Sequence, residues 1–498
     1  MCAHFADACA HAPEAVFLQL PDDGGEHSFA VMERRTAQLA GALRAQGIAA
    51  DSRVMVQAAK SPDMAALYLA VLRLGAIFIP LNTAYTAAEL QYFIADAAPH
   101  LLVCAPAAAP SVMALCAEAK TGTEVRTLGD ATSPQALERA AEQAEPIAQI
   151  ASRSDADLAA LLYTSGTTGR PKGAMLSHGN LASNAVVLRS LWAFRAEDVL
   201  LHALPLFHVH GLFVAMHCAL LAACRVLLLP KFDLAQIKRG LRQASVMMGV
   251  PTFYSRLLAD PEFGAADCAR MRLFISGSAP LSAPLHRDWL ARTGHRILER
   301  YGMTELGMVA SNPYAGERIA GTVGYALPGI AVRVADADGQ ELPRDSIGTL
   351  EVKGPNVFRG YWQRPTETAA EFRADGYFIT GDLATMAADG RIAIVGRAKD
   401  LIITGGYNVY PKEIETLLDA MPQVAESAVI GLPHPDFGES VCAIVVAADP
   451  ALSAAEVRRA LGGKLAKFKQ PSRVELVDSL PRNALGKVQK NVLRARYG

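Results

Sequence analysis

A short segment rich in glycine and hydroxyl side chains, residues 163–173, is the part of the sequence best suited to bind a phosphate. It reads Tyr-Thr-Ser-Gly-Thr-Thr-Gly-Arg-Pro-Lys-Gly and follows an apolar run, residues 158–162, that is expected to form a strand. Glycines allow a tight turn whose backbone N–H groups face an anion, and hydroxyl and ammonium groups add donors and one positive charge. The residues predicted to contact a phosphate are Thr164, Ser165, Gly166, Thr167, Thr168, Gly169 and Lys172.

The spacing in this segment excludes a P-loop of the Walker A type. That motif needs a glycine five residues after the first one, followed by Lys and then Ser or Thr. Here the fifth residue after Gly166 is Pro171, and Gly173 follows Lys172. A flexible surface loop would have a similar composition, but the order of these residues is more specific than such a loop requires. The segment therefore predicts a phosphate site of another kind.

The composition predicts a multidomain globular enzyme. A chain of 498 residues is too long for one hydrophobic core, and 51% hydrophobic with 19% charged residues is typical of a folded protein. The 48 basic and 49 acidic residues give a net charge of −1. The chain therefore lacks the overall basic excess that is typical of proteins that bind nucleic acid or an anionic membrane.

The cysteines and the apolar stretches favour a cytoplasmic location. Eight cysteines occur without any C-x-x-C pair, which indicates free thiols in a reducing compartment. The N-terminal residues lack the pattern of a secretory signal. Two apolar stretches, residues 64–81 and 212–229, are interrupted by charged or polar residues, and each is interpreted as a buried helix leading into a strand.

The first half of the chain alternates strand-like runs with helical patterns, which predicts parallel sheets covered by helices on both faces. A helix is expected over residues 30–46 with Gly47 at its left-handed end, whereas residues 106–150 show a weak pattern and are expected to be peripheral. The predicted strands are 54–56, 76–80, 100–104, 158–163, 226–229, 246–249 and 273–276.

The second half changes in character after about residue 320. Turn dipeptides at 338–339 and 389–390 separate β-rich runs, which predicts a small antiparallel barrel or sheet. From about residue 400, a helix opening at Pro411 and a capping box of Ser453 and Glu456 indicate a compact α+β unit. The expected fold is α/β: a large N-terminal domain, 1–398, of doubly wound sheets with a small β-barrel, and a smaller mobile α+β domain, 399–498.

Segment 163–173 resembles the signature of the adenylate-forming superfamily of acyl-CoA synthetases, luciferases and peptide-synthetase adenylation domains. Four further segments resemble the motifs of that superfamily in the same order, so the resemblance covers nearly the whole chain. They are Tyr301-Gly-Met-Thr-Glu305, Tyr377-Phe-Ile-Thr-Gly-Asp382, Gly396-Arg-Ala-Lys-Asp400 and Pro481-Arg-Asn-Ala-Leu-Gly-Lys487. The resemblance implies that a carboxylate attacks the α-phosphate of ATP, forming an acyl-adenylate and pyrophosphate, and that a thiol then displaces AMP.

The resemblance also implies a role for individual residues. Lys487 would be the catalytic lysine that reaches the carboxylate and the α-phosphate. Glu305, with Thr304 beside it, would bind Mg²⁺. Asp382 would bind the ribose, and Arg397 would donate further hydrogen bonds to the same sugar. A surface ion pair is the alternative interpretation of Arg397. The adenine would lie against Gly277, Ser278, Ala279, Tyr301 and Gly302. Lys399 would be the hinge of the mobile domain, and Gly405 and Gly406 would lie beside the coenzyme A channel.

Four stretches, residues 203–211, 248–254, 272–280 and 467–469, resemble malonyl-CoA synthetases within this superfamily. By this resemblance His208 borders the acyl pocket with a catalytic role, and Arg287 binds the second carboxylate of a diacid. Val209 and Met308 would shape the pocket near the α-carbon, and Val209 stands where that family often has Thr, which leaves methylmalonate open. Taken alone, Arg287 would be a solvated helix arginine and His208 a core histidine, although His208 and His210 on a strand would share one face.

The predicted reaction is the ATP-dependent formation of malonyl-CoA with ATP, Mg²⁺ and coenzyme A. Other functions remain open from the sequence: a CoA ligase for a short-chain or aryl monocarboxylic acid, an adenylation domain that loads a carrier protein, or a degenerate adenylate sensor. No carrier segment follows the C-terminal unit, so a small carboxylic acid and free coenzyme A are the expected partners, with no carrier protein, nucleic acid or membrane. A degenerate sensor is disfavoured because the sequence retains together the four residues with predicted roles in the reaction: Lys172, Glu305, Asp382 and Lys487.

Overall fold

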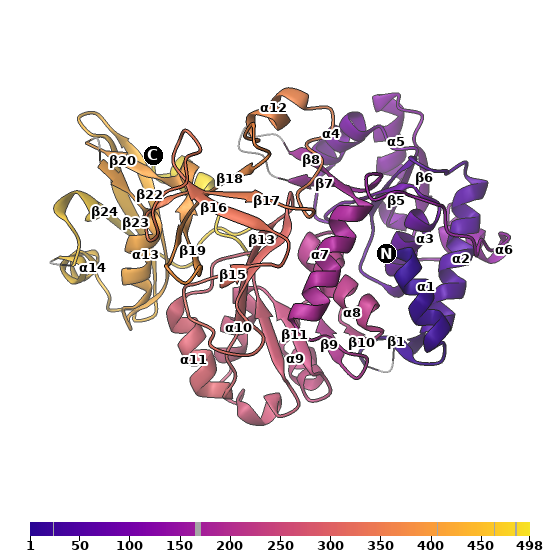
Figure 1. The fold of residues 1–498 in the computed structure, drawn as a ribbon, viewed down its shortest axis with the longest axis horizontal. Helices are drawn as coiled ribbons and strands as arrows, with labels where there is room; N and C mark the ends of the chain where they lie inside the picture. The colour runs from indigo at the N-terminus through magenta and orange to yellow at the C-terminus, as the bar shows by residue number, and fades with distance from the viewer. Residues whose placement is uncertain (23, 165–170, 406, 463, 484–485) are drawn as a thin grey trace.

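The computed structural model describes residues 1–22, 24–164, 171–405, 407–462, 464–483 and 486–498. Within them lie two large sheets, a small antiparallel sheet and a C-terminal α+β unit, which Figure 1 shows in orange and yellow at the far side from the N-terminus. The α/β architecture predicted from the alternating pattern is thereby confirmed.

The largest sheet has nine strands in the order β15-β14-β13-β12-β11-β9-β10-β1-β2. Its centre, from β13 to β1, is parallel, and its ends are antiparallel. The strands are β1 (Val16–Gln19), β2 (Glu26–Ser28), β9 (Val199–His202), β10 (Arg225–Leu228), β11 (Val246–Gly249), β12 (Leu273–Ser276), β13 (Leu298–Met303), β14 (Gly307–Ser311) and β15 (Tyr325–Ala326). Nucleotides bind at the carboxyl ends of parallel strands, so the ends of β12 and β13 are where a site is expected.

The second large sheet has six strands in the order β6-β5-β3-β4-β7-β8, parallel except for the final pair. The strands are β3 (Arg53–Gln57), β4 (Ile77–Pro80), β5 (Leu101–Cys104), β6 (Glu124–Thr127), β7 (Leu158–Thr164) and β8 (Lys172–Ser177). β6 is an edge strand that the weak pattern of residues 106–150 did not reveal. Its residues are mostly half-buried or exposed, so the apolar run that marks the buried strands is missing.

Helices cover both large sheets, and α7 contacts strands of each. The helices of this part are α1 (Cys2–His11), α2 (Phe29–Ala45), α3 (Pro62–Arg73), α4 (Ala87–Ala97), α5 (Ala109–Ala119), α6 (Leu137–Gln143), α7 (His178–Leu191), α8 (His217–Ala222), α9 (Leu234–Leu241), α10 (Pro251–Leu258), α11 (Ala283–Thr293) and α12 (Pro365–Ala370). The 3₁₀ segments η1 (Pro106–Ala108) and η3 (Ala265–Cys268) and the π-helix η2 (His210–Met216) join them. The helix expected at 30–46 is α2, and Gly47 has the left-handed φ of +77° that its end requires.

The β-rich unit, expected to be a small antiparallel barrel or sheet, is a four-stranded sheet in the described residues. It runs β16 (Ala331–Ala335), β17 (Gly348–Lys353), β18 (Phe378–Met386) and β19 (Ile392–Arg397), all antiparallel, and β16 and β19 are its two edges. Closing a barrel requires enough tilted and staggered strands for the first to pair with the last, and four strands in this order do not achieve it. β18 shows strict alternation of buried and half-buried residues, as expected when one face packs on the core.

The C-terminal unit follows η4 (Ala398–Asp400). The predicted boundary between residues 398 and 399 lies within this turn and stays a prediction. Its sheet has the order β21-β20-β23-β22, with β24 paired to β23. One apolar cluster lies under α13 and α14 and a second under α15, so helices cover both faces of the sheet and the unit has cores of its own. The elements are β20 (Ile402–Thr404), β21 (Tyr407–Val409), α13 (Pro411–Asp419), β22 (Val424–His434), β23 (Gly438–Ala447), α14 (Ala454–Leu461), η5 (Lys467–Lys469), β24 (Arg473–Val477) and α15 (Lys490–Tyr497).

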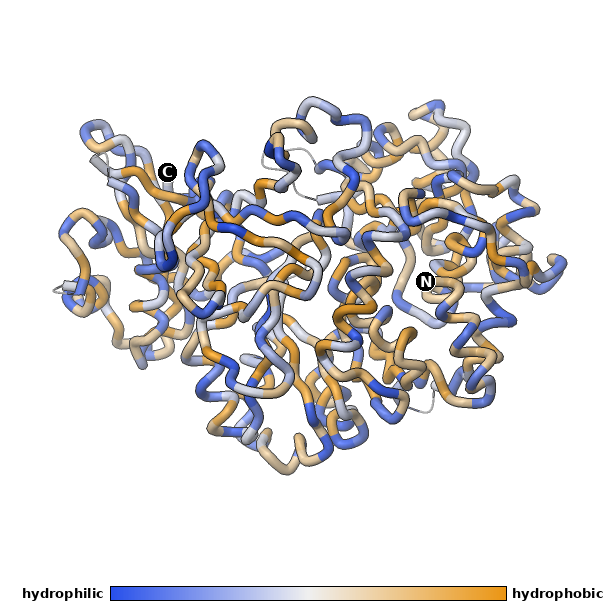
Figure 2. Tube along the Cα trace, in the orientation of Figure 1, coloured by the Kyte–Doolittle hydropathy of each residue, from blue (hydrophilic) through white to orange (hydrophobic). Residues whose placement is uncertain are grey.

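The main hydrophobic core is continuous from the N-terminal helices to the small antiparallel sheet. Figure 2 shows hydrophobic residues concentrated along the inner strands and helices, with hydrophilic residues at the outer turns. All eight cysteines are free and buried, as the sequence predicted. In the part of the chain that the structure describes, no helix is long and apolar enough to span a membrane, and the apolar stretches 64–81 and 212–229 form helix-to-strand units.

Candidate active site

The structure describes only the two ends of the segment that is predicted to bind phosphate. Ser165, Gly166, Thr167, Thr168 and Gly169 lie outside the described residues. Thr164, which ends β7, pairs directly with Lys172, which begins β8. Lys172 is buried, and its Nζ lies 3.2 Å from Oε1 of Glu371 and 4.7 Å from the ring centre of Tyr361. The antiparallel pairing of β7 and β8 therefore holds the lysine at the base of the predicted loop.

Glu305 lies in the same polar cluster. Its Oε1 accepts a hydrogen bond from Oγ1 of Thr164 at 3.4 Å and lies 3.1 Å from the hydroxyl of Tyr361. The Tyr361 hydroxyl is also 2.7 Å from Oε2 of Glu371, so a single proton is shared between two carboxylates. Loss of solvent raises the pKa of the buried Glu305 carboxyl. The two carboxylates lie close together with one lysine nearby. A divalent cation could bind their oxygens and neutralise their charge.

These residues fit the Mg²⁺ that the resemblance implies. Mg²⁺ prefers hard oxygen ligands and usually takes only one or two carboxylates, completing its shell with waters and substrate phosphates. Among the described residues no group of three or more His, Cys, Asp or Glu side chains could hold a metal by itself. Glu305, with Thr304 beside it, would hold the ion, and Glu371 and Tyr361 are neighbours that the sequence motifs did not single out.

A tight hairpin between β13 and β14 presents Tyr301, Gly302, Thr304 and Glu305. A side chain at Gly302 would place its Cβ 2.1 Å from the carbonyl oxygen of Gly307, so only glycine allows the two strands to approach this closely. The strand register shifts between Tyr301 and Gly302, which turns the following residues toward the phosphate cluster.

The predicted ribose site is assembled across β18 and β19. Asp382 and Arg397 are register partners, and Nε of Arg397 lies 2.7 Å from Oδ1 of Asp382. The hydroxyl of Tyr301 donates to the other carboxylate oxygen. Burial raises the pKa of Asp382, and the charge of Arg397 opposes this. Each oxygen keeps a free lone pair, so the carboxylate can still accept from two sugar hydroxyls.

The turn that follows β12 contains Gly277, Ser278 and Ala279, which were predicted to lie against the adenine. Ser278 has a left-handed φ of +68°, and its hydroxyl lies 3.2 Å from Nδ1 of His210. A Cβ at Gly277 would lie 2.4 Å from Cζ of Arg300, so the guanidinium packs directly on this turn. Left-handed backbone in a non-glycine residue costs energy and is concentrated at functional sites.

Lys487 reaches the same region from the C-terminal unit. Its loop is closed by Asn483, whose side-chain oxygen accepts from the Lys487 backbone N–H at 3.0 Å. A Cβ at Gly486 would lie 3.1 Å from Oγ1 of Thr252 on α10, so the loop rests on the large domain. Although the residue as a whole is exposed, loss of solvent lowers the pKa of Lys487, the charge of Arg397 adds to this, and Asp382 and Glu305 oppose it. The lysine, the predicted magnesium ligand and the ribose carboxylate therefore share one site.

The histidine segment differs from its prediction. His208 lies in a bend after β9, and the π-helix η2 begins at His210, so the two histidines are not alternate residues of one strand. A π-helix inserts an extra residue per turn and often occurs at functional sites. His208 is half-buried, and loss of solvent followed by the charges of Lys487 and Arg300 lowers its pKa to about 3, so the imidazole is neutral at physiological pH.

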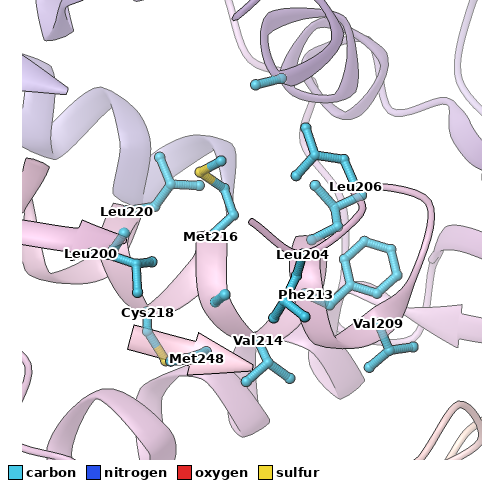
Figure 3. Packing of buried hydrophobic residues seen from close by; sticks show 14 of the residues in the cluster. Leu200, Leu204, Leu206, Val209, Phe213, Val214, Met216, Cys218, Leu220 and Met248 are labelled. Carbon is cyan, nitrogen blue, oxygen red and sulfur yellow. The ribbon is translucent and has the colours of Figure 1, made fainter. Parts of the chain in front are cut away.

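The residues predicted to shape the acid pocket divide into two groups. Val209 and Met308 are buried, and Figure 3 shows Val209 packed near Phe213. Val209 and Thr304 line a cavity of about 10 Å³ that is mainly apolar. Arg287, in contrast, has an exposed side chain on α11 and no hydrogen bond or ion pair within the described residues. The predicted role of Arg287 in binding a second carboxylate therefore stays a prediction.

Two basic residues near this pocket, one buried and one half-buried, were missed by sequence reasoning. Arg300, directly before Tyr301, is only 3% exposed. Lys60 donates to Nδ1 of His202 at 2.7 Å and to the backbone oxygens of His202 and Leu204 at 2.8 and 2.9 Å, which holds the chain leading to His208. An isolated Arg or Lys is usually a surface residue, so only the spatial arrangement reveals them.

The residues predicted to form the hinge and to line the coenzyme A channel lie at the start of the C-terminal unit. Lys399 is in η4, whose Asp400 pairs with Arg494 of α15 at 2.7 Å. Gly405 directly follows β20 with a left-handed φ of +55°, and its N–H donates to the carbonyl of Phe437 at 2.8 Å. Gly406 lies outside the described residues.

Taken together, the site joins a buried carboxylate cluster, a ribose-binding pair and a lysine delivered by a second domain. Such a set can neutralise a triphosphate and an incoming carboxylate at the same time, which is the requirement for activating an acid as its adenylate. The fold and the site thus define an adenylate-forming enzyme.

Comparison with known proteins places the chain in a named family. Residues 5–362 match the AMP-binding enzyme family and residues 413–487 match the AMP-binding enzyme C-terminal domain. The protein belongs to the AMP-binding enzyme family.

Individual relatives extend over nearly the whole chain. Malonate–CoA ligase of Mus musculus mitochondria is 39% identical over 84% of this chain and 77% of its own length. Feruloyl-CoA synthase of an Amycolatopsis species is 37% identical over 95% and 94%. The ATP-bound crystal structure of MatB from Rhodopseudomonas palustris superimposes with a TM-score of 0.96 at 51% identity, covering 100% of this chain and 99% of that chain.

A second structure of MatB gives a lower structural similarity. The apo structure of MatB from the same organism superimposes with a TM-score of 0.85 at 52% identity, covering 100% of this chain and 99% of that chain. Because the sequence likeness is the same, the difference between 0.96 and 0.85 reflects conformation. The present structure thus superimposes more closely on the ATP-bound structure of MatB than on the apo structure.

Proposed function

We propose that the protein is an AMP-forming malonate–CoA ligase. The observation that carries this proposal is the convergence of Lys487, Glu305 and Asp382 in one site, in a chain related along most of its length to malonate–CoA ligases of Mus musculus and, at 36% identity over 89% of this chain, Arabidopsis thaliana. The substrates are ATP, a small carboxylic acid and coenzyme A, with Mg²⁺ as the metal cofactor.

In the first half-reaction the acid carboxylate attacks the α-phosphate of ATP. One carboxylate oxygen forms a bond to phosphorus, the bond to the bridging oxygen breaks, and pyrophosphate leaves. Lys487 carries the positive charge that draws the two anions together and stabilises the charge that develops on the phosphate. Lys172 offers a second charge to the triphosphate, and Mg²⁺ when bound neutralises phosphate charge. Asp382 fixes the ribose and so the position of the phosphorus.

In the second half-reaction the thiol of coenzyme A attacks the acyl carbon. The thiol loses its proton, a thioester bond forms, and AMP departs with the electrons of the cleaved bond. Lys487 occupies the site in the present arrangement, so a rotation about Lys399 would withdraw it and present the Gly405 loop instead. The 3₁₀ turn η4 lies at an element end, where a change of backbone angles disturbs the least structure.

A second candidate is a CoA ligase for an aryl acid. Feruloyl-CoA synthase of Amycolatopsis and indoleacetate–CoA ligase of Aromatoleum aromaticum are 37% and 36% identical to this chain, close to the 39% of the mouse malonate enzyme. Malonate is the better supported acid, because malonate–CoA ligases of Mus musculus, Arabidopsis thaliana and Bos taurus are 39%, 36% and 35% identical to this chain.

Pyrophosphate release measured with ATP, Mg²⁺ and a panel of malonate, methylmalonate, acetate and ferulate tests the proposal. Malonate is expected to give the highest kcat/KM, with malonyl-CoA formed when coenzyme A is added. Preference for ferulate would favour the second candidate. Free coenzyme A is the proposed acceptor, so replacing it with a phosphopantetheinylated carrier protein should abolish thioester formation. The cytoplasmic location also remains part of the proposal, and cell fractionation tests it.

A further inference from the structure

Lys60 connects the two large sheets at the ends of their strands. It follows β3 of the six-stranded sheet, and its Nζ contacts His202, which ends β9 of the nine-stranded sheet and is 142 residues away in the chain. β3 and β9 each pair in parallel with their neighbours, so Lys60 and His202 both lie at carboxyl ends of parallel strands. Ligands bind at these ends in α/β sheets. The contact therefore joins the sheets at the edge that carries the reaction site.

The surroundings of Lys60 match the donors of an ammonium group. Its Nζ lies 2.7 Å from Nδ1 of His202, 2.8 Å from the backbone oxygen of His202 and 2.9 Å from the backbone oxygen of Leu204. An ammonium carries three protons, so each proton has an acceptor, and none of the three acceptors is a carboxylate. All three donors of this half-buried lysine are thus directed at one short stretch of chain.

His202 carries this restraint to a second point of the chain. Its Nε2 lies 2.9 Å from the carbonyl oxygen of Gly211, so Nε2 holds the ring proton and donates it, while Nδ1 accepts from Lys60. Loss of solvent, followed by the charge of Lys60, lowers the pKa of His202 to about 3, so the ring is neutral at physiological pH. The imidazole therefore connects Lys60 to Gly211 in a single tautomer.

The loop 202–211, which this connection closes, is tightly folded. A Cβ at Gly211 would lie 2.0 Å from the carbonyl oxygen of Pro205, so the end of the loop packs directly on its beginning. The π-helix η2 starts here, and the N–H of Leu212 donates to the carbonyl of His208 at 3.0 Å. Because the loop is short and closed, a shift at its base moves all of its residues.

Two residues of this loop are predicted to border the acid. The charge of Lys487 helps to lower the pKa of His208, which places the imidazole near the catalytic lysine. Val209 is buried and lines a cavity together with Thr304, next to the predicted magnesium ligand. The residues that hold the loop therefore decide where these two side chains lie in the active site.

We propose that Lys60 and His202 are positioning residues that fix the acid-binding wall of the active site through the loop 202–211. This inference rests on the proposed function and adds the residues that hold His208 and Val209 in place. Without the lysine, the backbone oxygens of His202 and Leu204 lose a donor, and the loop can shift. A displacement of about 1 Å at a reacting group can lower a rate by about 10²-fold.

The test compares malonate and methylmalonate in wild type and in Lys60→Met, which keeps the length of the side chain without its donors. In the variant, kcat/KM for malonate is expected to fall by about 10²-fold, while the KM for ATP stays as in wild type. The preference should move toward methylmalonate, because Val209 is no longer held in one position. Wild-type turnover is established first. If another acid is preferred, the proposed function fails, and the comparison is made with that acid and its methyl-substituted homologue.

Hydrogen exchange and a conservative variant separate positioning from general stability. Amide exchange followed by mass spectrometry should become faster in residues 203–211 of Lys60→Met and stay unchanged elsewhere, because only this loop loses its restraint. His202→Gln keeps a donor for Gly211 and an acceptor for Lys60, so it should retain most of the malonate turnover. His202→Leu supplies neither group and should resemble Lys60→Met.

Tyr68→Phe is the matched control. Tyr68 lies on α3, which follows Lys60, and its hydroxyl is 2.8 Å from Nε2 of a histidine, His217, at the start of α8. The variant therefore removes a buried hydrogen bond to a histidine beyond the loop 202–211. It should lower stability without changing the ratio of methylmalonate to malonate.

Three results would overturn the assignment. Wild-type kcat/KM for malonate in Lys60→Met would show that the loop keeps its position without the lysine. A similar rise in the KM for ATP, with faster exchange throughout the chain, would mean that Lys60 only supports the fold. If Lys60→Met does not fold, His202→Leu and His202→Gln decide: equal kcat/KM for malonate in the two contradicts the proposal, and a selective loss in His202→Leu supports it.

Discussion

Arg397 and Asp382 face each other across β18 and β19 as register partners, with Nε of the arginine 2.7 Å from Oδ1 of the aspartate. Arg397 is the last residue before η4, so the pair that is proposed to hold the ribose lies next to the proposed hinge. Nucleotide binding and domain rotation are thereby joined through one strand end. The strand register decides this relationship, because a shift of one residue would turn Asp382 to the opposite face of the sheet.

Asp382→Asn is expected to weaken ATP binding. The amide keeps the size of the carboxylate but loses its charge, and it leaves Arg397 and the ribose hydroxyls with one good acceptor oxygen. The loss of charge-assisted hydrogen bonds, about 1.5–3 kcal/mol, corresponds to about 10–100-fold in affinity. Calorimetric titration with ATP measures it. Asp389→Asn, at an exposed turn of the same sheet, should bind ATP as wild type does, and equal weakening in both variants would contradict the ribose assignment.

Lys487→Ala is expected to separate the two half-reactions. Adenylation should fall by about 10²–10³-fold, because one contact that stabilises the transition state is lost. Thioester formation from supplied acyl-adenylate should continue, since the lysine is not needed once AMP is attached. Pyrophosphate release and thioester formation are measured separately, with Lys464→Ala, an exposed lysine of the same domain, as the control. Intact adenylation in Lys487→Ala would remove the lysine from the mechanism.

Glu299→Gln is expected to stabilise the protein at alkaline pH. Burial raises the pKa of Glu299 from 4.5 to about 8, and its Oε1 accepts from the backbone N–H of Leu281 at 3.1 Å. Because the unfolded chain ionises at the ordinary carboxyl pKa, the stabilisation by the protonated group is complete below pH 4.5 and is lost as pH rises through about 8. Gln keeps the acceptor and cannot ionise. Thermal unfolding should show a higher Tm for the variant at pH 8.5 and equal values near pH 4.5, and a pH-independent difference would exclude this origin.

Gly302→Ala is expected to damage the β13–β14 hairpin. The added Cβ would lie 2.1 Å from the carbonyl oxygen of Gly307 and 2.5 Å from Cε of Met308, so the strands must separate. Overpacking of this kind costs about 1–3 kcal/mol and would move Thr304 and Glu305 away from the phosphate cluster. Denaturant unfolding and the Mg²⁺ dependence of adenylation measure the two effects. Gly396→Ala on β19, where no atom lies within 4 Å of the new Cβ, should unfold as wild type does.

Much of the fold could be predicted because its signals are local. The strand 273–276 and the helix opening at Pro411 were found from runs of apolar residues and from capping residues that lie in the same few positions of the chain. Two features were missed for the opposite reason. β6 is a half-exposed edge strand with no apolar run, and η2 is a π-helix, whose extra residue per turn has no signature in apolar spacing.

The sequence by itself determined which chemical groups this protein uses and in what order they occur. Lys172, Glu305, Asp382 and Lys487 each stand in a short motif whose residue types can be read without knowing what lies across from them. Only the tertiary structure decided what each group is paired with. Lys172 contacts Glu371, 199 residues away in the chain, whereas Arg300 contacts no carboxylate in the described residues. Burial and ion pairing depend on which elements pack together, and no local sequence pattern encodes that packing.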